Sequence, residues 1–274
     1  MPKLSCNISA SLMAALEGRQ QETGETMDHL VMRALADTLQ VDHATLFQVS
    51  TSGALIEGVI DGAVTVAELS LHGNLGLGTF ADLDGEMVIL DGTVYRVRSD
   101  GEVSVANQAD LVPFAVVTEF MPESLSELNE VTSYDDLLVR LDAQRNTNNQ
   151  FFAVRLEGTV DYLKTRAVGK STGDRSLVAA AEQQSEFELH DVEGVFVGFW
   201  SPSYAKSVNI SGWHVHFLTA DRQAGGHVLA CQGASLRAEA QHLSDFRIAI
   251  PETAAFLSAD LTRDPSAALE KAER

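Results

Sequence analysis

Two apolar segments near the C-terminal end, joined by a glycine-rich turn, constrain the fold of this chain more than any other feature. Residues 213–219 and 227–231 have the pattern of the two strands of a β-hairpin. His214 and His216 are two positions apart on the first strand, so their side chains lie on one face. His227 begins the returning strand, about 5 Å away. The pattern therefore predicts a β-sheet on which three imidazoles converge.

Three converging imidazoles form a nitrogen-only ligand set for a divalent cation. Zinc suits such a set, and three protein ligands leave a coordination position open, as in catalytic rather than structural sites. A lone His-x-His pair is more often an ordinary part of a strand, and the third histidine, after Gly225-Gly226, is what favours a Zn2+ site. We expect surface or structural roles for the other histidines, which are His29, His43, His72, His190 and His242.

An acidic side chain could complete or tune such a site. Glu86 follows Asp84-Gly85 just before an apolar strand and is a candidate, with an ordinary surface acid at the edge of a turn as the alternative. The sequence has no glycine-rich phosphate loop of the nucleotide-binding types and no Gly-x-Ser-x-Gly nucleophile elbow. The histidine triad is therefore the strongest chemical signal in the sequence.

Composition limits the classes of partner. The chain has 274 residues, 45% of them hydrophobic, and only two cysteines, Cys6 and Cys231, so its stability must come from a packed core. Its formal charge of −20 disfavours binding to nucleic acid or to an anionic membrane surface. An anionic substrate would need a local arginine or metal. We expect a cytoplasmic protein, because we find no signal-peptide pattern and no apolar run that could span a bilayer.

The first forty residues differ in character from the rest. Residues 4–8 alternate apolar and polar side chains like a short strand, a helical segment starts at Ser11, Gly24 interrupts it, and Thr26 is a typical N-cap of a second helix. This order resembles a ribbon-helix-helix unit, in which two chains pair their strands. The resemblance implies that three outward strand side chains face DNA, namely those of Lys3, Ser5 and Asn7.

Two interpretations of this N-terminal arm stay open. Only one of the three outward side chains is basic, and the acidic remainder of the chain would repel DNA, so DNA contact is disfavoured. The alternative is a dimerisation arm or a packed helical pair. We expect the arm to drive or reinforce a homodimer.

The rest of the chain predicts an α+β fold of two packed layers. The clearest strand signals are a hairpin over residues 87–97 that turns at Asp91-Gly92, a strand at 113–120, a strand pair at 151–162 and a strand at 195–200. Helices are expected over residues 124–146 and beyond residue 260. We expect an arm at 1–40, an N-terminal mixed-sheet subdomain at 41–150 and a β-rich C-terminal subdomain at 151–274 that carries the metal.

Separate motifs, in order from about residue 44 to the end, resemble the alpha-acetolactate decarboxylase family. They are Ser52-Gly-Ala-Leu-Ile-Glu-Gly-Val-Ile-Asp-Gly62, His72-Gly-Asn-Leu-Gly-Leu-Gly-Thr-Phe80, Leu83-Asp-Gly-Glu-Met87, Pro113-Phe-Ala-Val-Val-Thr118, Val154-Arg-Leu-Glu-Gly-Thr159, Thr165-Arg166, Val197-Gly-Phe-Trp-Ser-Pro202 and the His-x-His…Gly-Gly-His element. Residues 1–40 fall outside the resemblance and look like an added module.

The resemblance implies a zinc-dependent decarboxylase that converts (S)-2-acetolactate to (R)-acetoin and CO2 by Lewis-acid stabilisation of an enediolate. It implies three zinc ligands, His214, His216 and His227. It also implies a set of catalytic residues, namely Thr79, Glu86, Arg166 and a tail glutamate, for which Glu273 is the best match and Glu270 the alternative. After Arg166 the chain lacks the two prolines usual in the family, so we expect residues 167–175 to present the arginine more loosely.

Two other hypotheses compete with this one. A cupin-type metal enzyme also uses His-x-His on a strand, but cupins normally place a glutamate a few residues later, and here Phe217-Leu-Thr-Ala-Asp-Arg222 follows. The other hypothesis is a regulator that senses a small ligand with its body and binds DNA with its N-terminal arm. The decarboxylase is the hypothesis that accounts for the most residues.

Overall fold

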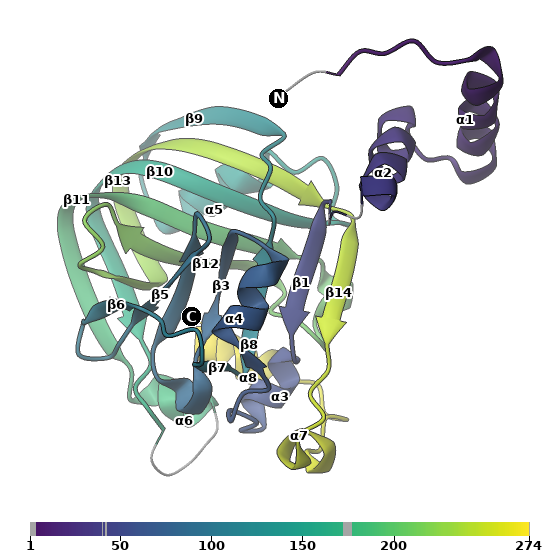
Figure 1. Ribbon diagram of the computed structural model, residues 1–274. Coiled ribbons are helices and arrows are strands. Elements are labelled where there is room, and N and C mark those ends of the chain that lie inside the picture. Colours follow the sequence, from purple (N-terminus) through teal and green to yellow (C-terminus); the bar gives the residue numbers. More distant parts are fainter. Residues whose placement is uncertain (1–3, 40, 42, 172–176, 274) are drawn as a thin grey trace. The chain divides into compact units, whose positions relative to one another are not determined.

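The structure is a computed structural model that describes residues 4–39, 41, 43–171 and 177–273 (Figure 1). Its backbone separates into two compact units, Met1–His43 and Ala44–Arg274. We describe each unit by itself. No helix in the described part of the chain is both long and apolar enough to span a bilayer.

The N-terminal unit consists of two helices, α1 (Ala10–Thr23) and α2 (Met27–Leu39). The Ser9 side chain caps α1, Gly24 ends it with a left-handed φ of 73°, and the Thr26 hydroxyl accepts a hydrogen bond from the His29 amide. The helices thus lie where the sequence predicts them. The strand expected at residues 4–8 is not formed, because a strand needs a neighbour and none of the described segments pairs with this one.

The first sheet of the larger unit has seven strands. In spatial order they are β14 (Asp245–Ala249), β1 (Thr45–Val49), β8 (Phe114–Thr118), β3 (Leu75–Thr79), β4 (Glu86–Leu90), β5 (Thr93–Val97) and β6 (Val103–Val105). All neighbours are antiparallel except β14, which runs parallel to β1. The expected hairpin at residues 87–97 is confirmed, since Asp91 and Gly92 both have the positive φ of a tight hairpin turn.

The second sheet has five longer antiparallel strands. In spatial order they are β10 (Phe151–Ala167), β11 (Ser185–Ser201), β12 (Gly212–Thr219), β13 (Gly225–Leu243) and β9 (Ser124–Val131). Because β13 also pairs with β10, four of these strands curl round and meet each other (Figure 1). A two-stranded ribbon of β2 (Val64–Thr65) and β7 (Leu111–Val112) completes the strands.

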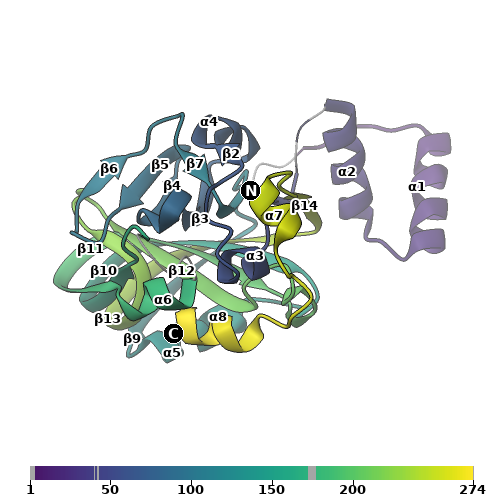
Figure 2. The same cartoon turned by 90° about the horizontal axis from the view of Figure 1, so that it is seen from below.

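Helices cover the sheets and their ends. They are α3 (Ser52–Ile56), α4 (Val66–Leu69), α5 (Tyr134–Asp142), α6 (Leu177–Glu182), α7 (Ala254–Ser258) and α8 (Ser266–Glu273), with 3-10 turns at Ser70–His72, Ala81–Leu83 and Ser203–Ala205. The helices α3, α6 and α8 contact one another and gather at one end of the two sheets (Figure 2). Their residues Leu55, Leu177 and Leu269 join the core.

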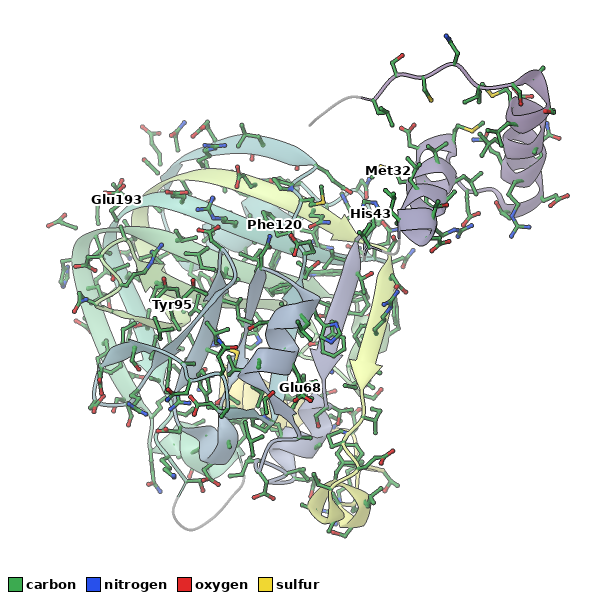
Figure 3. All side chains as sticks on the ribbon, in the orientation of Figure 1. Met32, His43, Glu68, Tyr95, Phe120 and Glu193 are labelled. Carbon is green, nitrogen blue, oxygen red and sulfur yellow. The ribbon has the colours of Figure 1, made fainter. Side chains whose placement is uncertain are left out.

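The two sheets pack face to face around the main hydrophobic core. Leu77 and Val88 of the first sheet and Val197 and Leu218 of the second belong to this one buried cluster. Partly buried side chains such as Tyr95 and Phe120 pack against it, and they are labelled in Figure 3. A second cluster fills the hollow of the curled sheet beneath α5, and a third lies on the outer face of the first sheet. The α+β class is therefore confirmed.

Two elements differ from the sequence prediction. Residues 124–131 form strand β9 rather than the start of a helix, and the helix begins only at α5. Residues 151–162, expected as a strand pair, belong to the single long strand β10. The first sheet takes β14 from the end of the chain, and the second takes β9 from residues before 150. The expected boundary near residue 150 stays a prediction.

Candidate metal centre

The strands β12 and β13 bring His214, His216 and His227 together. His216 and His227 are direct cross-strand partners, and His214 lies two positions before His216 on β12. All three side chains are buried, on the face that looks toward the first sheet. One nitrogen from each ring lies within 4.8 Å of the other two. The convergence predicted from the spacing is present.

A hydrogen bond between the two sheets sets the tautomer of His216. Its Nδ1 lies 2.8 Å from the backbone carbonyl oxygen of Met87 on β4. A carbonyl oxygen only accepts, so Nδ1 carries the proton, and the lone pair of the neutral ring is on Nε2. This is the usual way in which a protein orients a histidine that binds a metal. Nε2 of His216 lies 3.1 Å from Nε2 of His214.

Burial keeps His214 neutral. Burial, with the positive charge of Arg166 as a lesser cause, lowers the pKa of His214 to about 3. A neutral imidazole is the form that binds a metal ion. Two nitrogens on a tetrahedral zinc with bonds of about 2.0–2.1 Å are about 3.3 Å apart, close to the separation of His214 and His216. The donor set and its spacing therefore fit a divalent metal ion.

The first sheet contributes Glu86 and Thr79, which face each other across β3 and β4. Glu86 is 6% exposed, so it is not the surface acid that the sequence left open. One carboxylate oxygen lies 3.6 Å from Nε2 of His216, and the other accepts a hydrogen bond from the Val168 amide at 3.4 Å. The Thr79 hydroxyl donates to the carbonyl oxygen of Gly85 at 2.8 Å, which fixes the turn before Glu86.

Arg166 lies near the end of β10, directly opposite His227 of β13. It is 3% exposed, and its Nη1 donates to the side-chain oxygen of Gln184 at 2.9 Å. Sequence reasoning missed Gln184, because a glutamine that links a helix to a strand has no motif of its own. After Arg166, the backbone N–H of Val168 donates to Glu86, and residues 172–176 of the stretch lie outside the described part, so the looser presentation of the arginine stays a prediction.

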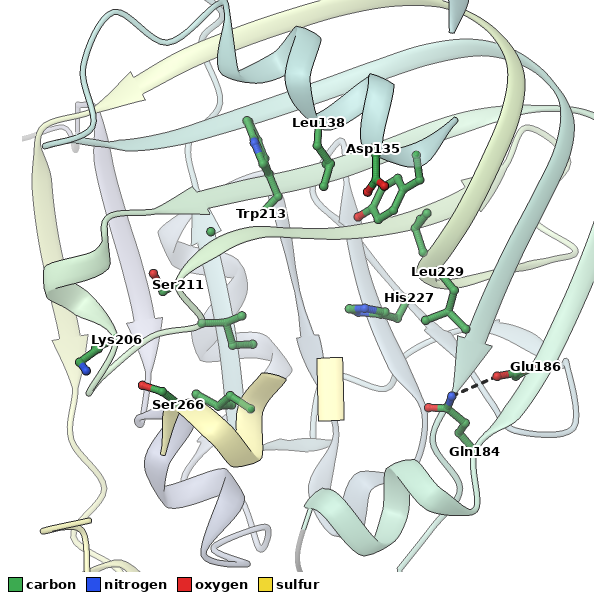
Figure 4. A pocket seen from close by; sticks show the side chains of 15 residues that line it. Asp135, Leu138, Gln184, Glu186, Lys206, Ser211, Trp213, His227, Leu229 and Ser266 are labelled. Atoms are coloured by element: carbon green, nitrogen blue, oxygen red, sulfur yellow. Dashed lines mark hydrogen bonds between the residues drawn. The ribbon is translucent and has the colours of Figure 1, made fainter. Parts of the chain in front are cut away.

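Two adjoining cavities meet at His227. The inner one, of about 20 Å³, is lined by polar and charged residues from both sheets and by apolar residues. The lining residues are Leu55, Gly78, Thr79, Glu86, Phe114, Arg166, Val168, Leu177, Ile210, His214 and His227. The outer one, of about 750 Å³, is lined by residues from α5, β12, β13 and α8 and also by Gln184 (Figure 4). Five of the residues predicted for the site thus surround one small space, and His216 lies behind them.

The tail glutamates are not placed by the structure. Glu270 and Glu273 belong to α8, which borders the outer cavity through Ser266 and Leu269, but their side chains lie outside the described part. Two other histidines have local partners away from the site. His72 stacks on Phe47, and His242 lies 3.2 Å from a carboxylate oxygen of Glu123.

The fold and the site define a class: an α+β protein of two packed sheets with a buried three-histidine centre open to a cavity. Comparison with known proteins makes the assignment specific. The family model for alpha-acetolactate decarboxylase matches residues 46–263, and the chain belongs to this family. The assignment favours neither the cupin nor the regulator hypothesis.

Curated relatives and solved structures agree. The chain is 38% identical to the alpha-acetolactate decarboxylase of Brevibacillus brevis, over 83% of this chain and 80% of the relative, and 40% identical to that of Methylococcus capsulatus, over 85% and 89%. The crystal structure of the Bacillus subtilis strain 168 enzyme superposes with a TM-score of 0.81 at 31% identity, covering 84% of this chain and 99% of that one.

Proposed function

We propose that this protein is a carboxy-lyase that converts (S)-2-acetolactate to (R)-acetoin and CO2. The observation that carries the proposal is a buried histidine triad whose His214 and His227 line one cavity together with Glu86 and Arg166, in a chain that belongs to the alpha-acetolactate decarboxylase family. In this reaction the bond from the carboxylate carbon to its neighbour breaks, the electron pair moves toward the adjacent ketone, and the neighbouring carbon then takes up a proton.

We propose zinc as the cofactor, held by His214, His216 and His227. When bound, the cation supplies Lewis acidity to the ketone and hydroxyl oxygens, where negative charge builds up as CO2 leaves. The chain's part is to hold the three imidazoles in place and to keep His214 neutral. The bond from His216 to the Met87 carbonyl and the burial of His214 are the observations that support this role.

Arg166 is suited to bind the substrate carboxylate. Its guanidinium is permanently charged and can donate two parallel hydrogen bonds to a carboxylate. Because the residue is buried, water screens its attraction for an anion only a little. A chain with a formal charge of −20 needs such a local cation to hold an anionic substrate. Its place opposite His227 puts the guanidinium on the same face of the sheet as the triad.

Glu86 is suited to hold or move the proton that the product carbon receives. Among the described residues, Glu86 is the carboxylate in the lining of the inner cavity, which His214 and Arg166 also line. Thr79 supports it by holding the turn at Gly85. A tail glutamate, Glu273 or alternatively Glu270, is proposed to complete the site from α8.

We further propose a cytoplasmic homodimer joined through the N-terminal arm. Within that unit only Leu30 is buried among the large apolar side chains described, and a set of others is exposed: Leu4, Ile8, Leu12, Met13, Val31, Met32, Leu35 and Leu39. A unit of about forty residues with so small a core usually needs a partner. Leu35→Glu in the full chain, with Asp37→Asn as the control, should lower the mass found by light scattering. A monomeric parent protein would contradict the proposal.

The deciding experiment measures acetoin and metal on one sample. Purified protein is mixed with racemic acetolactate, and acetoin, its configuration and the metal content per chain are determined. Chelator should abolish acetoin formation, and Zn2+ should restore it. Formation of acetoin at the uncatalysed rate by metal-loaded protein would refute the activity, and full activity after complete metal removal would refute the cofactor.

A further inference from the structure

The contact between Arg166 and Gln184 joins a charged group to a neutral one. The guanidinium Nη1 donates to the amide oxygen of Gln184 at 2.9 Å. An amide oxygen fixes the direction of a guanidinium N–H without adding a negative charge, whereas a carboxylate would compete with an anionic substrate for the same donors. Gln184 also lines the outer cavity, so the contact lies where the substrate would enter.

A carboxylate is nevertheless close at hand. Glu186 of β11 is the cross-strand partner of Arg166 on one side, as His227 is on the other. Directly opposed residues of an antiparallel pair have their side chains on the same face. Glu186 therefore has the register to form an ion pair with Arg166, which would reduce the charge available to a substrate.

Two contacts draw Glu186 away from this pairing. One of its carboxylate oxygens lies 2.6 Å from Nζ of Lys164, and the other accepts from the amide nitrogen of Gln184 at 3.4 Å. The bond between Gln184 and Glu186 is drawn in Figure 4. Gln184 thus accepts from Arg166 with its oxygen and donates to Glu186 with its nitrogen, so it stands between the two charges.

We propose that Gln184 is a positioning residue that directs the Arg166 guanidinium toward the substrate carboxylate, and that Lys164 keeps Glu186 from neutralising it. The inference rests on the proposed function, because it assumes that Arg166 binds the substrate's carboxylate. Because the two residues would act on substrate binding, their substitution should change KM more than kcat.

The first test compares Gln184→Ala with Gln183→Ala. Gln183 is the exposed residue next to Gln184 in the segment that joins α6 to β11. Gln184→Ala should raise KM for acetolactate about tenfold with kcat changed less than about threefold, while Gln183→Ala leaves both unchanged. The melting temperatures of both variants should stay close to that of the parent. An unchanged KM in Gln184→Ala would overturn the inference.

Gln184→Glu gives a readout that a purely structural role would not move. This variant keeps a side-chain oxygen that can accept from Arg166 and keeps the side-chain length, but it adds an ionisable carboxyl group beside Arg166. KM should then rise as the pH goes up through the ionisation of the new carboxyl, a dependence absent from the parent and from Gln184→Ala. A pH-independent KM ratio between Gln184→Glu and the parent would count against the inference.

Lys164→Met tests the second half of the proposal. Releasing Glu186 should raise KM about threefold, and adding Glu186→Gln should remove most of that rise, so the two changes are not additive. Additive effects would overturn the role given to Lys164. Arg166→Ala is measured in parallel: if it leaves KM and kcat intact, the proposed role of Arg166 fails, whereas a large loss there with no effect at Gln184 overturns this inference alone.

Discussion

The Nδ1 of His216 lies 2.8 Å from the backbone carbonyl oxygen of Met87, so a strand of the first sheet fixes the tautomer of a histidine on the second. Glu86, the neighbour of Met87, reaches the same imidazole from the same strand. The orientation of His216 therefore depends on the packing of the two sheets, and metal binding and packing of the body should be coupled.

His216→Ala should abolish tight metal binding. The residue is fully buried, and its loss removes one of three ligands and the bond to Met87. We expect the metal content to fall from about one per chain to nearly none and the melting temperature to become insensitive to chelator. The parent should lose stability with chelator. His190→Ala, an exposed histidine on β11, is the control and should keep its metal.

Glu86→Gln should reduce kcat while leaving the fold intact. The amide keeps the shape and can still accept the bond from Val168, but it cannot hold or move a proton. Loss of a general acid or base costs about 10²–10⁴-fold in rate. Steady-state kinetics at several pH values measure the effect, with the exposed Glu57→Gln as the control. A kcat within twofold of the parent would remove Glu86 from the mechanism.

Gly226→Ala should disturb the pairing of β10 with β13. A Cβ at this position would collide with the carbonyl oxygen of Arg166, and the φ of +127° disfavours other residues as well. Gly212 also has a positive φ, of +88°, but nothing lies near its missing side chain. Gly226→Ala should therefore cost more than Gly212→Ala, which we expect to cost about 1–3 kcal/mol from backbone strain. Denaturant unfolding compares the two, and equal losses would contradict the collision.

The two thiols should differ in reactivity. Cys6 is exposed, whereas Cys231 is 1% exposed, and burial raises the pKa of its thiol to about 12. Only the thiolate is alkylated, so Cys231 should stay unlabelled in the native protein even as the pH rises from 7 to 9. Mass spectrometry after treatment with iodoacetamide should show one adduct per chain, and two after denaturation. Two native adducts at pH 7 would contradict the burial of Cys231.

The parts of the site that the sequence predicted are those set by local geometry. His214 and His216 share a face because strand side chains alternate, and the glycine-rich turn returns His227 beside them. Asp91-Gly92 likewise marks a hairpin through its need for positive φ. Position alone left Glu86 open between a site residue and a surface acid, and only the family resemblance implied Thr79 and Arg166, because these residues come from strands far apart in the chain from the histidines.

The errors arose where tertiary pairing overrides local pattern. Strand β9 lies at the edge of its sheet and buries few residues, so it lacks a clear alternation and its leucines resembled a helix. Gly158 interrupts the strand pattern in the sequence, yet β10 continues through it. Glycine is needed at this position because the backbone of Ser235 passes too close for any side chain. Gln184 is defined only by its contact with Arg166, which no local pattern reveals.

The parallel pairing of β1 with β14 matches Thr45 with Asp245, residues separated by most of the chain. On the ribosome β14 emerges long after β1, so the edge of the first sheet at β1 has no pairing strand during nearly all of synthesis. An unpaired sheet edge is a template for pairing with other chains. Truncated translation products that end before residue 245 should therefore aggregate, because they lack the strand β14 that pairs with this edge.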